Sequence, residues 1–114
     1  MFCCGSKGAA MKKRIYISGK MSGDPDYVQK FLNAEYQLTK AEYKTMNPTR
    51  FISSSANWNR AMRVAIYLMM KCDGVALLPD WKQSKGAKIE ERLARDIGMP
   101  VMPLDKWLNS NIAE

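Results

Sequence analysis

The sequence predicts one α/β domain built from a parallel sheet with helices on both of its faces. Its 114 residues match the usual size of a single domain. Short runs of strand-forming residues alternate with longer segments of helical periodicity, in the order β-α-β-α-β-α-β. Such alternation is typical of parallel sheets with right-handed crossovers. We therefore expect four or five strands in a domain of the flavodoxin or Rossmann type.

Turn-forming residues define the elements in the first half of the chain. Residues 1–10 are expected to be a leader, vector-derived or translated from an upstream start codon, which leaves residues 11–114 as the domain. Gly19 ends the first strand, and Asp24 and Pro25 are expected to supply the N-cap and the first turn of a helix. The expected elements are a strand at 14–18, a helix with apolar repeats through residue 41, a strand at 43–46 and a polar loop at 49–56.

The second half begins with a helix whose apolar residues share one face. The run GVALL then gives the clearest strand of the chain, because it is apolar throughout and is stopped by Pro79. Ser84 is expected to cap the next helix at its start, and Gly98 to cap it at its end. The expected elements are a helix at 58–69, a strand at 74–78, a helix at 84–97, a strand at 100–103 and a helical turn at 105–109.

The composition excludes several functional classes. There is no histidine, so Ser-His-Asp and Cys-His catalysis and the HExxH zinc site are excluded. The three cysteines lack the spacing of a metal site or a disulfide framework, and we expect no metal or other cofactor. No run reaches the roughly 18 apolar residues of a membrane span, and no signal peptide is recognisable. A cytoplasmic protein without membrane contact is expected.

The charge favours anionic partners. Eighteen Lys and Arg against eleven Asp and Glu give a net charge of +7. The chain lacks RGG repeats, an aromatic RNA-binding pattern and a block of basic residues, so a phosphorylated small molecule is expected before a nucleic acid. Solubility alone is the alternative explanation.

Two loops follow strands at the edge where parallel sheets bind ligands. The first contains Gly19 and Lys20, which would bring the backbone and an ammonium group close to an anion. The second leads through Ser84 and Gly86 into a helix, whose N-terminus is suited to phosphate. A plain β-α turn, a surface lysine and ordinary capping by Ser84 are the alternatives.

Glu90 is the strongest candidate for a catalytic residue. With Ala87, Ala94 and Ile97 it lies on one face of the expected third helix, and that face is otherwise apolar. A carboxylate on a buried face is costly unless it is paired or used. The spacing also allows an ion pair with an arginine, or partial exposure at the edge of the face.

Four segments spread over residues 14–102 form a distinctive combination: IYISGKMSG, Asn47-Pro48, CDGVALLPDW and SKGAKIE. Together they resemble the nucleoside 2-deoxyribosyltransferase-like superfamily, closest to its short bacterial and phage members. The resemblance implies either transfer of deoxyribose between bases or hydrolysis of the N-glycosidic bond of nucleoside 5′-monophosphates. It also implies Glu90 as the nucleophile at the anomeric carbon and Tyr16 as the residue that orients it.

Ser84 matches the position that separates these two activities, with aspartate in the transferases and serine in the monophosphate hydrolases. A hydroxyl, the Gly86 amide and a helix N-terminus attract a phosphate that an aspartate would repel. The resemblance therefore favours the 5′-monophosphate branch, with Gly19 and Lys20 as further phosphate ligands.

The second helix departs from the pattern of the superfamily at Ala65, where an aspartate helps to protonate the leaving base. A missing general acid costs about 10²–10⁴ in rate. Asp80 follows the central strand at the ligand-binding edge and is the candidate replacement. A simple turn aspartate is the alternative for Asp80.

Two functions remain in competition. The first is an N-glycosidase acting on a nucleoside or deoxynucleoside 5′-monophosphate through Glu90, Tyr16 and Asp80. The second is a nucleotide-binding or sensing module without turnover. A third function, that of a basic protein that contacts nucleic acid, has less support than these two. We also expect a homodimer or larger homo-oligomer, because so small a sheet leaves apolar helix faces short of cover and methionine supplies adaptable contacts.

Overall fold

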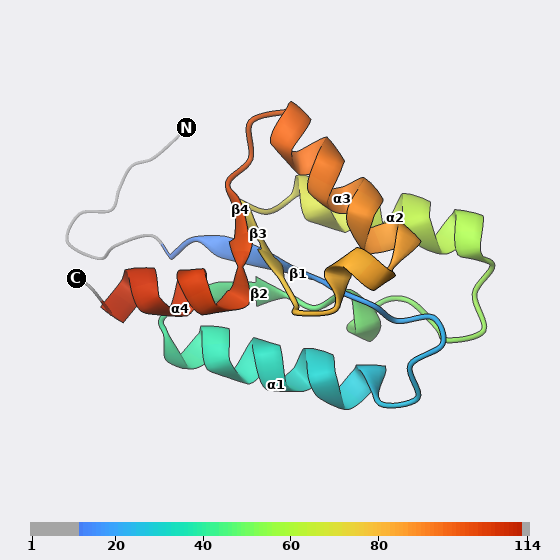
Figure 1. Cartoon of the computed structure of the whole chain (residues 1–114), viewed down its shortest axis with the longest axis horizontal. Coiled ribbons are helices and arrows are strands. Elements are labelled where there is room, and N and C mark those ends of the chain that lie inside the picture. The colour runs from blue at the N-terminus through green and yellow to red at the C-terminus, as the bar shows by residue number, and fades with distance from the viewer. Residues whose placement is uncertain (1–11, 113–114) are drawn as a thin grey trace.

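A computed structural model describes residues 12–112 as a parallel sheet between two layers of helices (Figure 1). The expected leader at 1–10 lies outside the described residues. No helix in the described part has the length and apolar character needed to cross a membrane. The elements are β1 (Arg14–Ser18), α1 (Tyr27–Lys40), β2 (Lys44–Met46), the 3₁₀ helix η1 (Pro48–Arg50), α2 (Trp58–Met70), β3 (Gly74–Leu77), the 3₁₀ helix η2 (Trp81–Gln83), α3 (Lys85–Asp96), β4 (Val101–Pro103) and α4 (Leu104–Ile112).

The four strands lie in the order β2-β1-β3-β4, and every neighbouring pair is parallel. This confirms the predicted parallel α/β fold. The chain passes from β1 to β2 on one side and then crosses to β3 on the other, so the strand order reverses between β1 and β3. Ser18 pairs with Leu77 at the carboxyl ends of these two strands. Ligands of such sheets bind beyond this point of reversal.

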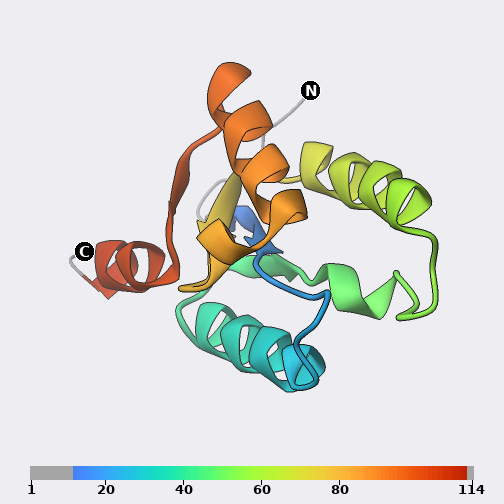
Figure 2. The ribbon, with the colours of Figure 1, turned by 45° about the vertical axis from the view of Figure 1, so that its right-hand side comes forward.

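The helices cover the sheet in pairs, with α1 and α4 on one face and α2 and α3 on the other (Figure 2). Within β1, Ile15 and Ile17 pack in the first of these layers and Tyr16 packs in the second. Alternate strand residues point to the same face, so Ser18 joins Tyr16 beneath α2 and α3. The fold thereby presents two hydroxyl groups of one strand to one pair of helices.

The start of α1 differs from the prediction. Its N-cap is Asp26, which makes no capping hydrogen bond through its side chain. Asp24 instead accepts the Asp26 N–H on Oδ1 at 2.9 Å and the Tyr27 N–H on its carbonyl at 3.2 Å. Such a turn satisfies the backbone locally and competes with capping. The assignment of Asp24 as N-cap and Pro25 as first helical residue is therefore wrong.

Two further differences concern α4 and the end of α3. In place of a single turn at 105–109, α4 is a helix of nine residues. Trp107 is buried there, and its Nε1 donates to the Val75 carbonyl at 2.8 Å while its own carbonyl accepts the Tyr43 hydroxyl at 2.8 Å. Ile97, expected on the buried face of α3, is the C-cap of that helix and is 50% exposed.

Candidate active site

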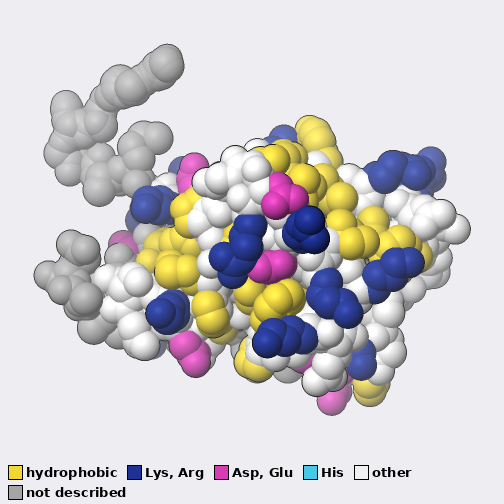
Figure 3. Space-filling model, turned by 45° about the horizontal axis from the view of Figure 1, so that its top comes forward, with side chains coloured by type: hydrophobic (Ala, Val, Ile, Leu, Met, Phe, Trp, Pro, Cys, Tyr) yellow, Lys and Arg dark blue, Asp and Glu magenta, His cyan; other side chains and the backbone are white. Residues whose placement is uncertain are grey.

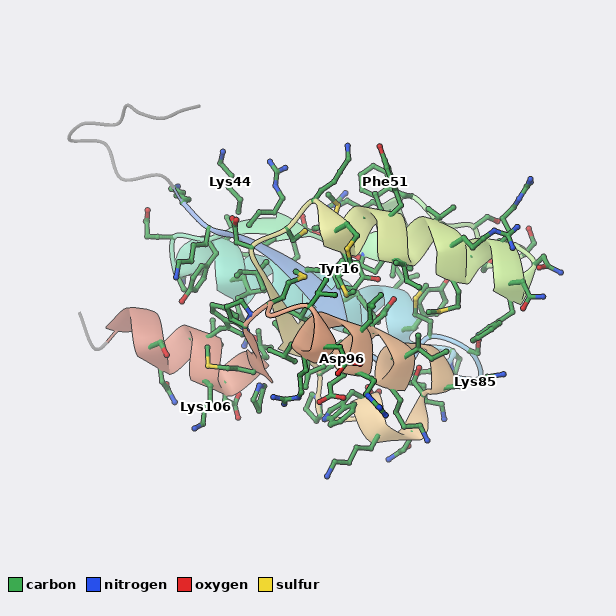
Figure 4. The ribbon with its side chains drawn as sticks, turned by 90° about the horizontal axis from the view of Figure 1, so that it is seen from above. Tyr16, Lys44, Phe51, Lys85, Asp96 and Lys106 are labelled. Atoms are coloured by element: carbon green, nitrogen blue, oxygen red, sulfur yellow. The ribbon has the colours of Figure 1, made fainter. Side chains whose placement is uncertain are left out.

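A cleft of about 690 Å³ opens beyond the carboxyl end of β1. Its walls come from the loop after β1, from the segment that leads into α2 with the first turns of that helix, and from the first turns of α3. Seen from above, Tyr16 lies between α2 and α3 (Figure 4). The volume falls in the usual range of small-molecule sites, about 300–1,000 Å³.

Glu90 lies at the base of this cleft. Its side chain is 5% exposed, and Ala87 and Ala94 on the same face of α3 are also buried, as the helical spacing predicted. Oε2 accepts the Tyr16 hydroxyl at 2.8 Å, and Oε1 accepts the Ser18 hydroxyl at 2.7 Å. Burial raises the pKa of Glu90 to about 7, and the two hydrogen bonds oppose that rise.

Both hydroxyl groups act as donors toward this carboxylate. Burial, followed by the nearby Glu90 charge, raises the pKa of Tyr16 well above its ordinary value, so the phenol keeps its proton. Ser18 is 1% exposed and was not singled out by the sequence. The sequence feature that could have identified Ser18 is its position two residues after Tyr16, because this spacing puts both hydroxyls on the same face of β1. The two groups fix the Glu90 carboxylate in one orientation.

The first turn of α3 forms the polar rim of the cleft. Ser84 is the N-cap as predicted, and its Oγ accepts the Ala87 N–H at 3.0 Å. The N–H groups of Lys85 and Gly86 belong to the turn for which helix geometry provides no acceptor. A Cβ at Gly86 would lie 2.8 Å from the Met62 sulfur, so glycine lets this turn approach α2 closely. Ser84 and Gly86 both line the cleft.

The loop after β1 reaches the same cleft through Gly19 and Lys20. Gly19 is required by packing, because a Cβ there would lie 2.7 Å from Cδ1 of Leu78. The Lys20 N–H donates to Oδ1 of Asp80 at 3.1 Å. The loop is therefore held against the end of β3 by both apolar and polar contacts.

Lys30 on α1 completes this attachment. Its ammonium forms ion pairs with the carboxylates of Asp24 and Asp80, and it donates to the Lys20 carbonyl at 2.8 Å. The hydrogen bond from Lys30 lowers the pKa of Asp24. Asp80 is thus directed at Lys30 and does not belong to the lining of the cleft. Sequence reasoning missed Lys30, whose partners lie in two loops far apart in the chain.

The side of the cleft formed by α2 is largely apolar. Ala65 is 5% exposed there, and Met62 and Ile52 line the cleft beside it. Trp58 stands nearer the entrance, where the Lys85 ammonium lies 4.6 Å from the centre of its ring. The cleft therefore combines a buried carboxylate, a polar rim and an aromatic, apolar wall.

Basic residues are distributed over the face formed by α2 and α3 and are interspersed with acidic and apolar side chains (Figure 3). On α3, Arg95 pairs with Glu91 and Arg92 pairs with Asp96. This mixed surface differs from the continuous basic stripe that usually marks a nucleic-acid interface.

Metal ligation and thiol chemistry find little support among residues 12–112. No three His, Cys, Asp or Glu side chains there gather closely enough to hold a metal ion. Cys72 lies before β3, at the amino end of the sheet, and burial raises its pKa to about 12. Its thiol therefore stays protonated near neutral pH and is a poor nucleophile.

A match to a known protein family covers all the residues that line the cleft. Residues 13–103 match a family model described as Domain of unknown function (DUF4406). The chain belongs to this family. No curated protein matches the chain significantly. The DUF4406 match carries no assigned activity with it, so the resemblance to the nucleoside 2-deoxyribosyltransferase-like superfamily remains a prediction.

Proposed function

We propose that the protein is an N-glycosidase that binds a nucleoside or deoxynucleoside 5′-monophosphate and cleaves its N-glycosidic bond, with water or another base as acceptor. The observation that carries this proposal is Glu90: a buried carboxylate at the base of a cleft, with both oxygens oriented by Tyr16 and Ser18. A carboxylate that acts as nucleophile is one of the two groups that glycoside cleavage uses.

In the proposed reaction, a Glu90 oxygen attacks C1′ of the sugar as the bond to the base breaks. Water or a second base then displaces the carboxylate from C1′. The hydroxyls of Tyr16 and Ser18 hold the carboxylate in position during both steps, which lowers the cost of reaching the reactive geometry.

The polar rim would bind the phosphate. The Ser84 hydroxyl, the first N–H groups of α3 and the helix dipole all favour an anion at this point. On the opposite side, the loop after β1 lines the cleft with Lys20 and Gly19, which add an ammonium group and a backbone contact. A 5′-phosphate bound here would place the sugar between the rim and Glu90.

Base release tests the proposal. Purified protein is incubated with ribo- and deoxynucleoside 5′-monophosphates, and free base is measured by chromatography. The rate of base release by the Glu90→Gln variant should fall by a factor on the order of 10³ or more, because this variant lacks the nucleophile. Glu91→Gln is the matched control, because it makes the same change one residue further along α3, where Glu91 pairs with Arg95. Full activity in Glu90→Gln would refute the mechanism.

A nucleotide-binding module without turnover is the second candidate. It is favoured by the apolar Ala65 in the cleft wall and by Asp80, which pairs with Lys30. Nucleotide binding by calorimetry without release of base would support this candidate over the first.

We also infer that the protein acts in the cytoplasm as a homodimer or larger homo-oligomer. Tyr67 and Met70 on α2 are 60% and 44% exposed, and Phe51 is 61% exposed. Light scattering coupled to size exclusion measures the mass, and a monomer at micromolar concentration would contradict this inference.

A further inference from the structure

The groups around Glu90 limit the kind of base that can leave. N-glycosidic cleavage of a neutral base normally requires an acid that protonates the departing nitrogen. In the described cleft, the wall on the α2 side presents Ala65, Met62 and Ile52, which have no proton to donate. Ser53 and Ser54 lie next to Ile52 in the lining, and their hydroxyls are too weakly acidic to protonate a leaving base. A leaving base that lies against this wall therefore contacts a largely apolar surface.

The two nearby aspartates are committed elsewhere. Asp24 lines the cleft, but Lys30 and the Asp26 N–H bind its carboxylate and lower its pKa, so it is ionised at neutral pH and carries no proton. Asp80 accepts from Lys30 and from the Lys20 N–H and is not part of the lining. Both carboxylates thus serve to hold the loop after β1 against the end of β3.

The same cleft is well suited to a flat cation. Trp58 lines the cleft at its entrance, where its ring could stack on a flat cation in place of the Lys85 ammonium, which lies 4.6 Å from the ring centre. Tyr27 and Tyr16 also line the cleft, and Glu90 supplies an anion at its base. A positively charged aromatic ring would be attracted by both kinds of group.

We propose that the substrate is a nucleoside 5′-monophosphate whose base is a quaternised, positively charged ring, such as an N-ribosylpyridinium or an N7-alkylated purine. This inference rests on the proposed N-glycosidase function and specifies its substrate class. A cationic base needs no proton, because the electron pair of the breaking C1′–N bond neutralises its charge.

The step balances without a general acid. A Glu90 oxygen forms a bond to C1′, the C1′–N bond breaks, and the base leaves as a neutral molecule. Water then attacks C1′ of the sugar–Glu90 ester, which frees the carboxylate and releases one proton to solvent. The products are the sugar 5-phosphate, the neutral base and that proton.

A matched pair of nucleotides tests the substrate class. Guanosine 5′-monophosphate and 7-methylguanosine 5′-monophosphate differ by one methyl group and one positive charge, and nicotinamide mononucleotide supplies the pyridinium case. Free base is measured by chromatography, with Glu90→Gln and the uncatalysed reaction subtracted. The kcat/KM for the two cationic substrates should exceed that for guanosine 5′-monophosphate by at least about 100-fold, the lower range of what a general acid contributes.

Each outcome separates this inference from the function on which it rests. If the kcat/KM ratio of cationic to neutral substrate is below about 100 and base release depends on Glu90, the inference on the substrate class is overturned and the N-glycosidase function stands. Absence of base release from all three nucleotides overturns both the inference and the N-glycosidase function.

The Ala65→Asp variant supplies a second measurement. It places a carboxyl group in the apolar wall and should lower the kcat/KM ratio of cationic to neutral substrate by speeding cleavage of the neutral substrate. An unchanged ratio in the folded variant counts against the inference.

Discussion

Replacing Glu90 by glutamine should change how stability depends on pH. Glutamine keeps the shape of the side chain and removes the charge. Its amide oxygen can still accept from one of the two hydroxyls of Tyr16 and Ser18, while its NH2 group donates to the oxygen of the other. Burial raises the pKa of Glu90 from 4.5 to about 7, so between these pH values the folded protein keeps a proton that the unfolded chain has released. The free energy of unfolding of the wild type therefore falls as the pH rises through this window. At roughly 1.4 kcal/mol per pH unit, the loss is about 3 kcal/mol.

Urea unfolding followed by circular dichroism at pH 4.5 and pH 8 measures this effect. Glu90→Gln should be more stable relative to the wild type at pH 8 than at pH 4.5, by about 3 kcal/mol. Glu91→Gln should follow the wild type at both pH values. Parallel pH dependence of Glu90→Gln and the wild type would refute the argument that burial of an ionised Glu90 is costly.

Three further substitutions test the site and its supports. Ser18→Ala removes a hydrogen bond that lowers the pKa of Glu90, so base release should begin about one pH unit higher, and an unmoved pH profile would contradict this. Gly19→Ala brings a Cβ within 2.7 Å of Leu78 and should cost about 1–3 kcal/mol in urea unfolding, whereas a neutral effect would mean that the loop yields. Lys30→Met removes the shared partner of two carboxylates and should lower the melting temperature by about 4–8 °C, measured calorimetrically, and an unchanged value would show that the ion pairs add no stability.

The fold was predictable because most elements carry their own local signals. The GVALL run is apolar throughout and bounded by Pro79, and Gly98 has the positive φ of 84° that a helix end favours. The exception is α4, whose length depends on hydrogen bonds between Trp107 and two distant segments. Such contacts leave no periodic trace in the local sequence.

The candidate site was predictable only in part. Glu90 stood out because one charged residue interrupts an apolar helical face, and that pattern survives in the sequence. Ser18 was missed because a serine at a strand end is common, and its partner lies 72 residues away. Asp80 was expected to face the ligand, yet the position of Lys30 on α1 decides where its carboxylate points. Ion pairs between loops depend on packing that only the folded chain defines.

The placement of the tryptophans gives the protein its own optical probes. Trp107 is 4% exposed and bonded to the sheet through its indole nitrogen, whereas Trp58 is 38% exposed at the entrance of the cleft. The emission of Trp58 should therefore respond to occupancy of the cleft, and that of Trp107 to separation of α4 from β3. Variants that lack the third tryptophan, Trp81, and keep only one of these two indoles would let a single instrument follow ligand binding and unfolding as separate signals.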